Sequence, residues 1–318
     1  MTTTTHEAEA RPVASARRAI QPVAQLRDLL GAAIRHALGS AKGELGVYAS
    51  PDGDAGLFGP DSIAWVVHAD LPVMLVGGFS ALMLQTLHPL AMAGVADHSR
   101  FREDPLGRLH RTARFVAGTT FGPMPFVERL IAEVRAVHDR VHGTAPDGRP
   151  YSAHDPDLLR FVHVTEVSSF LRSYQRYSTR PLLRGEKDRY LAEIAEVARR
   201  LGATDVPQST TEVRDYLRDI RPSLCATPAA LEAVRFLRRP LGGPLIERGA
   251  QRLVTEAAID LLPGFARRML GFHEVPVLTP ALARPATTSF ALALRWATSP
   301  SPVVEISRAR VARGRLNV

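Results

Sequence analysis

Residues 126–142 read FVERLIAEVRAVHDRVH and carry the clearest folding signal in this chain of 318 residues. Apolar side chains recur at intervals of three and four residues, which is the spacing of one face of an α-helix. These side chains are Val127, Leu130, Ile131, Val134, Val137 and Val141. Gly143 follows directly, and glycine is a typical helix stop. The stretch therefore predicts a helix over residues 126–142 with one buried apolar stripe.

Similar helical signals lie on both sides of this stretch. Asp104-Pro105 and Asp155-Pro156 each place an N-capping carboxylate before a proline at the first helical position. No internal repeat and no run of alternating strand residues occurs, so the predicted fold class is all-α. The other expected helices cover residues 73–88, 105–120, 156–177, 185–201, 211–219, 228–236, 245–262, 264–270 and 286–296.

The composition changes twice along the chain. Residues 1–25 are rich in Thr, Ala, Glu and Arg and have no sustained apolar face, which is typical of a disordered segment. Residues from 274 onward are rich in Pro and Arg and have an uneven period. We therefore predict a disordered segment over 1–25, a single helical domain over 26–273 and a C-terminal extension over 274–318.

The chain is basic, with 40 Lys and Arg against 32 Asp and Glu and a net charge of +8. Lys42 and Lys187 are its two lysines, and the arginines are interleaved with acidic residues. No basic block with interleaved aromatic residues occurs, so nucleic-acid binding is not expected. Cys225 is the single cysteine, which excludes an intrachain disulfide and a thiolate metal cluster.

Residues 71–96 contain no Asp, Glu, Lys or Arg and are a candidate membrane span. Pro72 and Pro89 interrupt them, and residues 73–88 would span only about 24 Å as a helix, less than the ~30 Å of a bilayer core. We prefer a buried core helix, with at most a peripheral membrane contact. The first residues lack the apolar region of a secretory signal, so we expect a cytoplasmic protein.

His138 is the most informative of the eleven histidines. It lies on the shoulder of the apolar stripe of residues 126–142, whereas His142 lies further out, beside Gly143. Three interpretations of His138 stay open. It is a hydrogen-bonded core histidine, an axial ligand of iron in a helical pocket, or half of an i,i+4 metal-binding pair with His142. The pair lacks the Glu of a metalloprotease motif.

Two other segments combine polar and apolar residues at helical spacing. Arg108 and Thr112 share one helix face. That face is either an exposed basic surface or a guanidinium that binds an anionic propionate beside a hydroxyl. His163 and Glu166 lie in a wide apolar helix, where a carboxylate needs a partner. Glu166 either orients a ligand histidine, acts as an acid or base, or pairs with an arginine.

Several short motifs resemble the domain shared by the latex-clearing rubber oxygenases and the fungal MpaB oxygenase. Each motif is weak alone, whereas their common order is fairly specific and covers about residues 57–272. The motifs are Phe58-Gly59-Pro60-Asp61-Ser62 with Trp65, His88-Pro89, Asp97-His98-Ser99, Asp104-Pro105-x-x-Arg108-x-x-x-Thr112, His138-x-x-Val141-x-Gly143, Tyr151-Ser152-Ala153 with Asp155-Pro156, and Val162-His163.

The resemblance implies a globin-like helical core that encloses haem b. His138 matches the proximal iron ligand, and Arg108 and Thr112 match residues near the haem. His163, in the last motif, is a further cofactor-binding candidate. Rubber oxygenases have a lysine before the threonine that can cap the iron. Arg111 stands there in this chain, and arginine offers no lone pair, so we expect no such cap.

The resemblance also implies a haem-dependent oxygenase or peroxygenase-like enzyme. Its partners would be dioxygen or peroxide and an apolar small molecule, such as a terpenoid or lipid. In this hypothesis the catalytic side carries Arg108, Arg111 and Thr112. Two alternatives remain: a non-catalytic haem carrier or sensor, and a cofactor-free helical interaction protein whose histidines all belong to the core.

Overall fold

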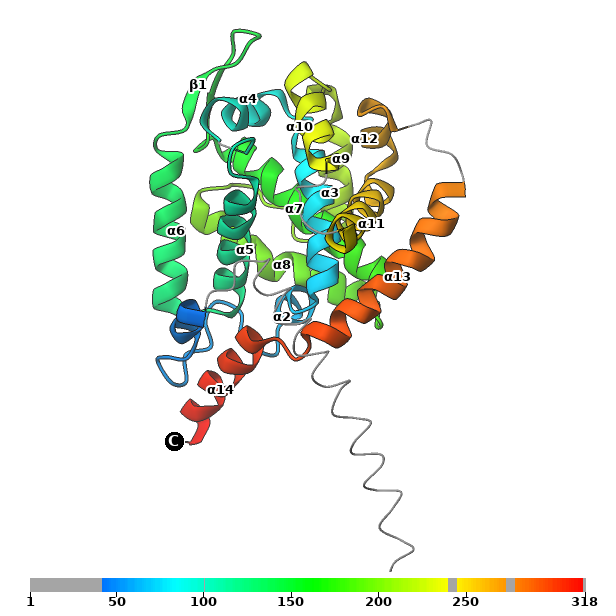
Figure 1. Ribbon diagram of the computed structural model, residues 1–318. Coiled ribbons are helices and arrows are strands. Elements are labelled where there is room, and N and C mark those ends of the chain that lie inside the picture. Colours follow the sequence, from blue (N-terminus) through cyan, green and yellow to red (C-terminus); the bar gives the residue numbers. More distant parts are fainter. Residues whose placement is uncertain (1–41, 100, 240–244, 273–277, 317–318) are drawn as a thin grey trace, which may run out of the picture.

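The computed structural model describes residues 42–99, 101–239, 245–272 and 278–316, and the predicted N-terminal segment 1–25 lies outside them. Helices form most of the described chain, together with one two-stranded hairpin (Figure 1). The all-α prediction is therefore confirmed. The described chain also contains η1 (Lys42–Tyr48), α9 (Thr210–Asp219), η2 (Arg221–Ser223), α10 (Pro228–Arg238) and α12 (Gly264–Met269).

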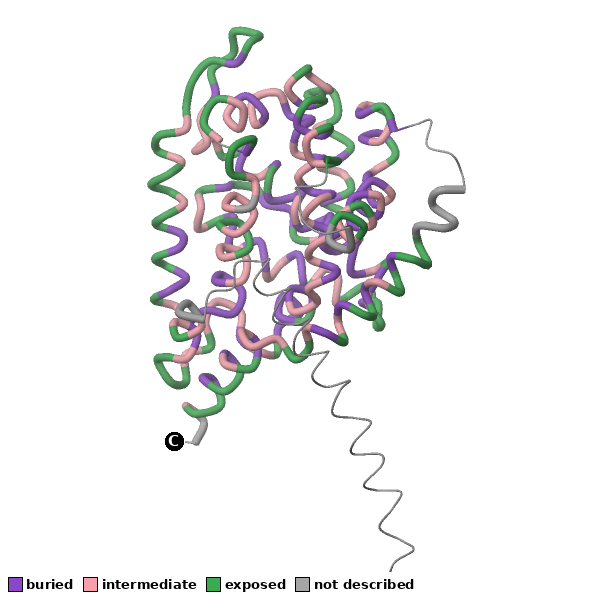
Figure 2. Tube along the Cα trace, viewed as in Figure 1, coloured by how far each residue is buried: buried purple, intermediate pink, exposed green. Residues whose placement is uncertain are grey.

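Two apolar helices, α3 (Leu71–Gln85) and α7 (Pro156–Tyr177), pack against each other at the centre of the fold. They approach closely because Gly77 of α3 lies against Phe170 of α7. A Cβ atom added at Gly77 would come within 2.8 Å of Phe170 Cδ1 and 3.0 Å of its Cα. Most residues of α7 are buried, as the purple segments at the centre of Figure 2 show. The burial of these two helices anchors the core.

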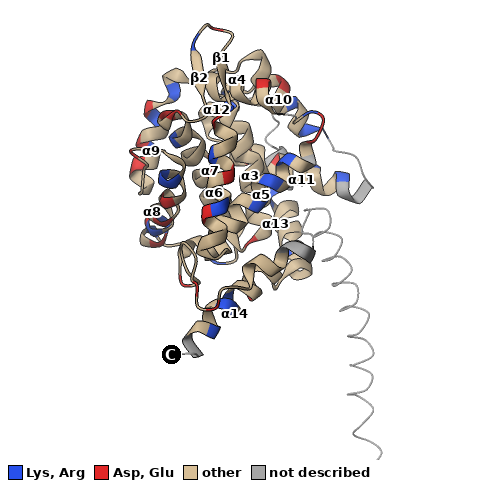
Figure 3. Cartoon of the chain, turned by 90° about the vertical axis from the view of Figure 1, so that its left-hand side faces the viewer, with Lys and Arg blue, Asp and Glu red and all other residues tan. Residues whose placement is uncertain are grey.

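Helices α2 (Ile63–His68), α8 (Arg184–Leu201) and α11 (Leu245–Leu261) pack around this pair. Their buried side chains, among them Val67, Ile194 and Ala257, join α3 and α7 in one apolar cluster. Figure 3 shows that basic and acidic residues are interspersed along α8 and α9. The positive net charge is therefore not gathered on these two helices.

The chain bends between α3 and α4 (Pro89–His98), as His88-Pro89 predicts. Pro89 occupies the first turn of α4, where its missing N–H leaves no helical hydrogen bond unmade. Among the described residues, no single helix is long and apolar enough to cross a membrane. By length and composition alone, α3 and α4 together satisfy the requirement, but they meet at a bend of 104°.

Helix α5 (Pro105–Phe121) begins after its predicted cap, because Asp104 Oδ1 accepts a hydrogen bond from the backbone N–H of Gly107 at 2.8 Å. Helix α6 (Met124–His138) ends four residues before the predicted position. Strand β1 (His142–Thr144) follows it and pairs antiparallel with β2 (Pro150–Ser152). Helical periodicity did not predict this hairpin, whose register depends on pairing between two separate segments.

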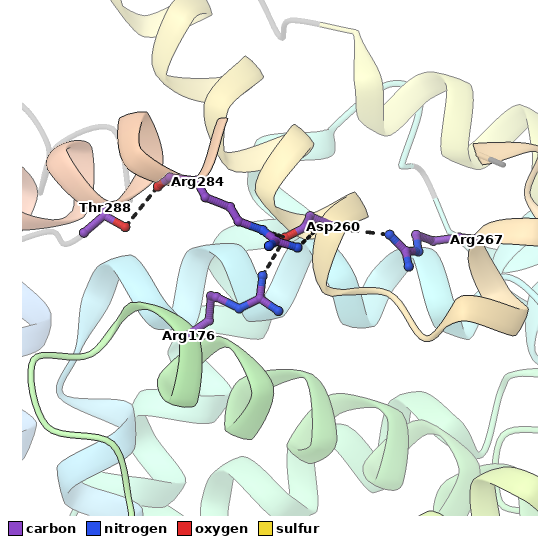
Figure 4. Close-up of polar contacts among 5 residues, drawn as sticks. All are labelled: Arg176, Asp260, Arg267, Arg284 and Thr288. Atoms are coloured by element: carbon purple, nitrogen blue, oxygen red, sulfur yellow. Dashed lines mark hydrogen bonds and ion pairs between the residues drawn. The ribbon is translucent and has the colours of Figure 1, made fainter. Parts of the chain in front are cut away.

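The last helices, α13 (Leu278–Thr298) and α14 (Pro302–Leu316), lie within the predicted C-terminal extension. Arg284 Nε of α13 donates to Asp260 Oδ2 of α11 at 2.9 Å, and Arg295 Nε donates to Asp70 Oδ2 at 3.0 Å. Figure 4 shows Arg284 and Arg176 of α7 converging on Asp260. Ion pairs at two points thus hold α13 against the helical core.

Candidate functional site

Helices α5 and α6 form an antiparallel hairpin that turns at Gly122. Arg114 of α5 pairs with Glu133 of α6, with Nη1 and Oε2 2.9 Å apart. Arg108 precedes Arg114 by six residues, which places it roughly 9 Å further from the turn. His138 follows Glu133 by five residues, roughly 8 Å further from the turn. The hairpin therefore brings Arg108 and His138 to the same end.

His138 is the last residue of α6 and is half-buried. Its Nδ1 atom is fully buried and has no hydrogen-bond partner in the described part of the chain. Its ring packs edge to face against that of His154, with the centroids 5.8 Å apart. Burial and then His154 lower the pKa of His138, and Asp139 opposes them only in part. The neutral imidazole has a nitrogen lone pair, as a metal ligand requires.

The apolar stripe of α6 is buried over its first half. Leu130 is 2% and Ile131 7% exposed, whereas Val137 on the same stripe is 49% exposed. The predicted burial is therefore wrong at Val137, because α6 lies at the edge of the fold and the half of it that leads to His138 is mostly exposed (Figures 1 and 2). As a result, apolar surface is exposed directly beside His138.

His142 does not share a helix face with His138. It is exposed and lies in β1, where its backbone carbonyl accepts a hydrogen bond from His98 Nε2 at 3.2 Å. Side chains four residues apart face the same way only within a continuous helix, so the proposed i,i+4 metal pair is not formed. Among the described residues, no group of three or more His, Cys, Asp or Glu is arranged to hold a metal ion.

Arg108 is half-buried near the start of α5. Its Nη1 atom donates a hydrogen bond to Ser99 Oγ at 2.5 Å. Burial and then the neighbouring Arg111 lower the pKa of Arg108, and no described carboxylate pairs with it. A buried cation without an opposite charge is destabilising, and an anionic partner would offset that cost.

Arg111 and Thr112, the two other residues predicted for this helix, are exposed. The Arg111 side chain is 68% exposed, and its Nη1 atom lies 3.2 Å from Asp104 Oδ2. The Thr112 hydroxyl donates to the backbone carbonyl of Arg108 at 3.1 Å. Thr112 thus bonds within α5, and Arg111 bonds to Asp104, the N-terminal cap of the same helix.

A polar contact joins α4 to the hairpin that follows His138. The Tyr151 hydroxyl of β2 donates to Asp97 Oδ2 at 2.5 Å and accepts from His98 Nε2 at 3.2 Å. Gly143, opposite Tyr151, leaves no room for a side chain, because a Cβ atom there would lie 2.6 Å from the hydroxyl oxygen. The sequence motifs contain these residues, but neither their mutual contact nor the position of His154 was predictable from spacing.

His163 lies inside α7, and no hydrogen bond or ring contact joins it to Arg108 or His138 among the described residues. Its Nε2 atom is buried without a partner, and burial followed by Arg199 lowers its pKa to about 4. Burial also raises the pKa of Glu166 to about 7. Pairing with an arginine, one of the three interpretations left open for Glu166, is not formed among the described residues.

A second buried histidine, His68 of α2, was not selected from the sequence. Its Nδ1 atom lies 2.7 Å from Thr120 Oγ1, and its Nε2 atom lies 3.0 Å from the Tyr190 hydroxyl. Thr120 donates to the Val116 carbonyl at 2.7 Å, so it accepts from Nδ1, and Tyr190 donates to Nε2. Burial lowers the pKa of His68 to about 3. With both nitrogens bonded, His68 is a structural core histidine.

The residues at the open end of the α5–α6 hairpin fit haem b. Haem needs an imidazole nitrogen for its iron, apolar surface for its ring and cations for its propionates. His138 offers an unpartnered nitrogen, Val137 an exposed apolar side chain and Arg108 a cation without a described carboxylate. The three requirements are met by residues of one hairpin.

A comparison with known protein families identifies the family of this chain. The family model described as "ER-bound oxygenase mpaB/B'/Rubber oxygenase, catalytic domain" matches residues 65–298, which is most of the chain. No curated protein and no solved structure gives a match. The matched range contains α5, α6 and α7, and it confirms the family resemblance that the sequence motifs indicated. The chain belongs to the family of the mpaB/B' and rubber oxygenase catalytic domain.

Proposed function

We propose that this protein is a haem b-dependent oxygenase in which His138 is the proximal ligand of the iron. The observation that carries the proposal is the buried Nδ1 atom of His138, which has no hydrogen-bond partner in the described chain. Buried imidazole nitrogens normally have a partner or bind a metal. The oxygenase class of the family supports the same function.

Arg108 is the residue that would bind a haem propionate. Its guanidinium is half-buried and meets no described carboxylate, while Ser99 Oγ fixes one of its nitrogens at 2.5 Å. A planar guanidinium binds a carboxylate through two parallel hydrogen bonds, so the remaining donors suit a propionate. Arg108 would then bind a propionate of the haem, and His138 would bind its iron.

Bound haem would supply the oxygen chemistry, and the protein would orient the haem and the substrate. His154 packs against the ring of His138, and its own Nε2 atom lies 2.6 Å from Asp139 Oδ1. This contact holds the His154 ring and limits rotation of the His138 ring. Thr112, whose hydroxyl bonds to the carbonyl of Arg108 in its own helix, would offer a hydrogen bond to dioxygen or peroxide.

An apolar small molecule, such as a terpenoid or lipid, is the substrate class that we propose. The surface beside His138 includes the half-buried Val134 and the exposed Val137. Apolar side chains at a concave or cofactor-lined site favour apolar ligands. Dioxygen or peroxide would be the second substrate.

The test is the absorption spectrum of the full chain expressed with an ample haem supply, followed by extraction of the pigment as its pyridine complex. We expect a Soret band and the pyridine spectrum of haem b. A colourless protein that does not bind added hemin would contradict the proposal. Oxygen consumption with apolar substrates then separates an oxygenase from a haem carrier, because a carrier keeps the Soret band without turnover.

A further inference from the structure

A hollow with a volume of about 340 Å³ lies between α7, α8 and α11, on elements that carry neither Arg108 nor His138. Its lining contains three cationic side chains, two leucines and one glutamine, and no acidic residue. The lining residues are Leu171, Arg172, Gln175, Arg176, Lys187 and Leu261. A hollow with this lining is electrostatically suited to an anion.

Arg172 is the most unusual residue of the hollow. Its Nη1 atom is fully buried and has no hydrogen-bond partner in the described chain. Burial lowers its pKa to about 10, and no carboxylate contributes to that pKa. Arg172 as a whole is half-buried, but a buried N–H donor of a cation that has neither a hydrogen-bond partner nor an opposite charge is destabilising. A ligand that accepts from the Arg172 guanidinium would remove this cost.

The other two cations leave the hollow positive. Arg176 Nη1 lies 2.7 Å from Asp260 Oδ2, but that carboxylate also binds Arg284 at 2.9 Å and has Arg267 at 4.0 Å. Figure 4 shows the three arginines around the single carboxylate. Lys187 is half-buried and forms no ion pair with a described residue. Asp260 therefore does not neutralise the charge of the hollow.

We propose that this hollow binds the oxyanion head of a small amphipathic molecule, a carboxylate or a phosphate monoester. Arg172 and Lys187 donate hydrogen bonds to the oxyanion, and Leu171 and Leu261 contact the first carbons of its apolar stem. Arginine is suited to the head because its fork of N–H donors matches the geometry of carboxylates and phosphates. This site is separate from the proposed haem site, and its test does not depend on whether the protein binds haem.

The test is calorimetric titration of the full-length protein with three probes: octanoate, inorganic phosphate and octanol. We expect octanoate to bind, octanol to bind much more weakly, and Arg172→Met to lose about tenfold or more in octanoate affinity, because one charge-assisted hydrogen bond contributes about that much. If phosphate binds as well, the hollow also accepts a free oxyanion that has no apolar stem. Binding of octanoate without phosphate would identify a carboxylate that needs its apolar stem.

Two further variants keep the test decisive. Lys187→Gln changes a half-buried lysine, so it tests the site even if Arg172→Met misfolds. Arg214→Met is the matched control, since this arginine of α9 is 71% exposed and lies outside the hollow. Without ligand, Arg172→Met should have a higher Tm than the wild type, because an unpaired buried charge is gone. Equal binding of octanol and octanoate, no binding of octanoate or phosphate, or unchanged affinity in both hollow variants would overturn the proposal.

Discussion

Arg310 of α14 donates a hydrogen bond from Nη2 to the carbonyl oxygen of Phe121, the last residue of α5, at 2.9 Å. The same guanidinium donates to the carbonyls of Tyr48 and Asp54, each at 2.8 Å, and the residue is fully buried. Three backbone carbonyls take the place of a carboxylate partner. One side chain thus ties the last helix to the end of α5 and to the loop at residues 48–54.

Arg310→Met should destabilise the fold by about 3 kcal/mol or more, because three backbone carbonyls, two of them in buried hydrogen bonds, lose a charged donor. Urea denaturation measures the loss as a lower midpoint with an unchanged slope. Arg308→Met is the matched control, since Arg308 is exposed on the same helix. An equally small effect for both variants would show that the Arg310 contacts contribute little to stability.

Acid should weaken the attachment of α13. Burial alone would raise the pKa of Asp260, but the hydrogen bond from Arg284 and the charges of Arg176 and Arg284 outweigh burial and lower it. A carboxyl with a lowered folded pKa contributes stability above its ordinary pKa, and that stability is lost as the pH falls through the folded pKa. The stability difference between wild type and Asp260→Asn should therefore shrink below about pH 4.

Denaturation of both proteins at a series of pH values checks this expectation. The difference should be constant at pH 6 and above, because Asp260 is ionised there in both the folded and the unfolded chain. A difference that stays the same down to the lowest accessible pH would contradict the role of the Asp260 charge.

Glu166 should affect the pH dependence of stability in the opposite direction to Asp260. Burial raises its folded pKa to about 7, so the folded chain binds more protons than the unfolded chain between the ordinary pKa and pH 7. The wild type then loses stability over this range as the pH rises. Glu166→Gln should remove the loss and be more stable at pH 8 by at most about 3 kcal/mol, with little difference at pH 4. An equal gain at both pH values would indicate a packing effect instead.

The helices were predictable because their signals are local. Asp104 and Asp155 cap α5 and α7 as expected, and Thr227 Oγ1 accepts from Ala230 N at 3.1 Å at the start of α10. Each of these contacts spans two or three residues. Propensity and periodicity describe such distances well.

The contacts between distant segments that shape the fold and the candidate site could not be predicted from local patterns. Tyr151 and Asp97 are 54 residues apart, and Arg310 and Phe121 are 189 apart. The exposure of Val137 also depends on which helix lies beside α6, which its own sequence does not specify. The motifs selected Arg108 and His138 as candidates, but their common position at one end of the hairpin emerged only from the fold.

Arg111 should leave the sixth position of the iron free of a side-chain nitrogen. Its guanidinium lies 3.2 Å from Asp104 Oδ2, and arginine has no lone pair to donate. The ferric haem-loaded protein should therefore bind imidazole or cyanide without a slow step, and Arg111→Lys should shift the electron paramagnetic resonance signal toward low spin. A wholly low-spin, bis-nitrogen signal in the wild type would refute this expectation.

The most direct test of the central claim compares haem retention in His138→Ala, His142→Ala and His163→Ala. Each variant is expressed as the full chain with the same haem supply, and its haem content per protein is measured together with circular dichroism to establish folding. We predict that His138→Ala loses haem while folded, and that His142→Ala and His163→Ala largely keep it. His138 has an unpartnered ring nitrogen and lies at the same end of the α5–α6 hairpin as Arg108, whereas His142 lies in β1 and His163 lies inside α7. Retention of haem in folded His138→Ala, with loss in either of the other two variants, would contradict the account.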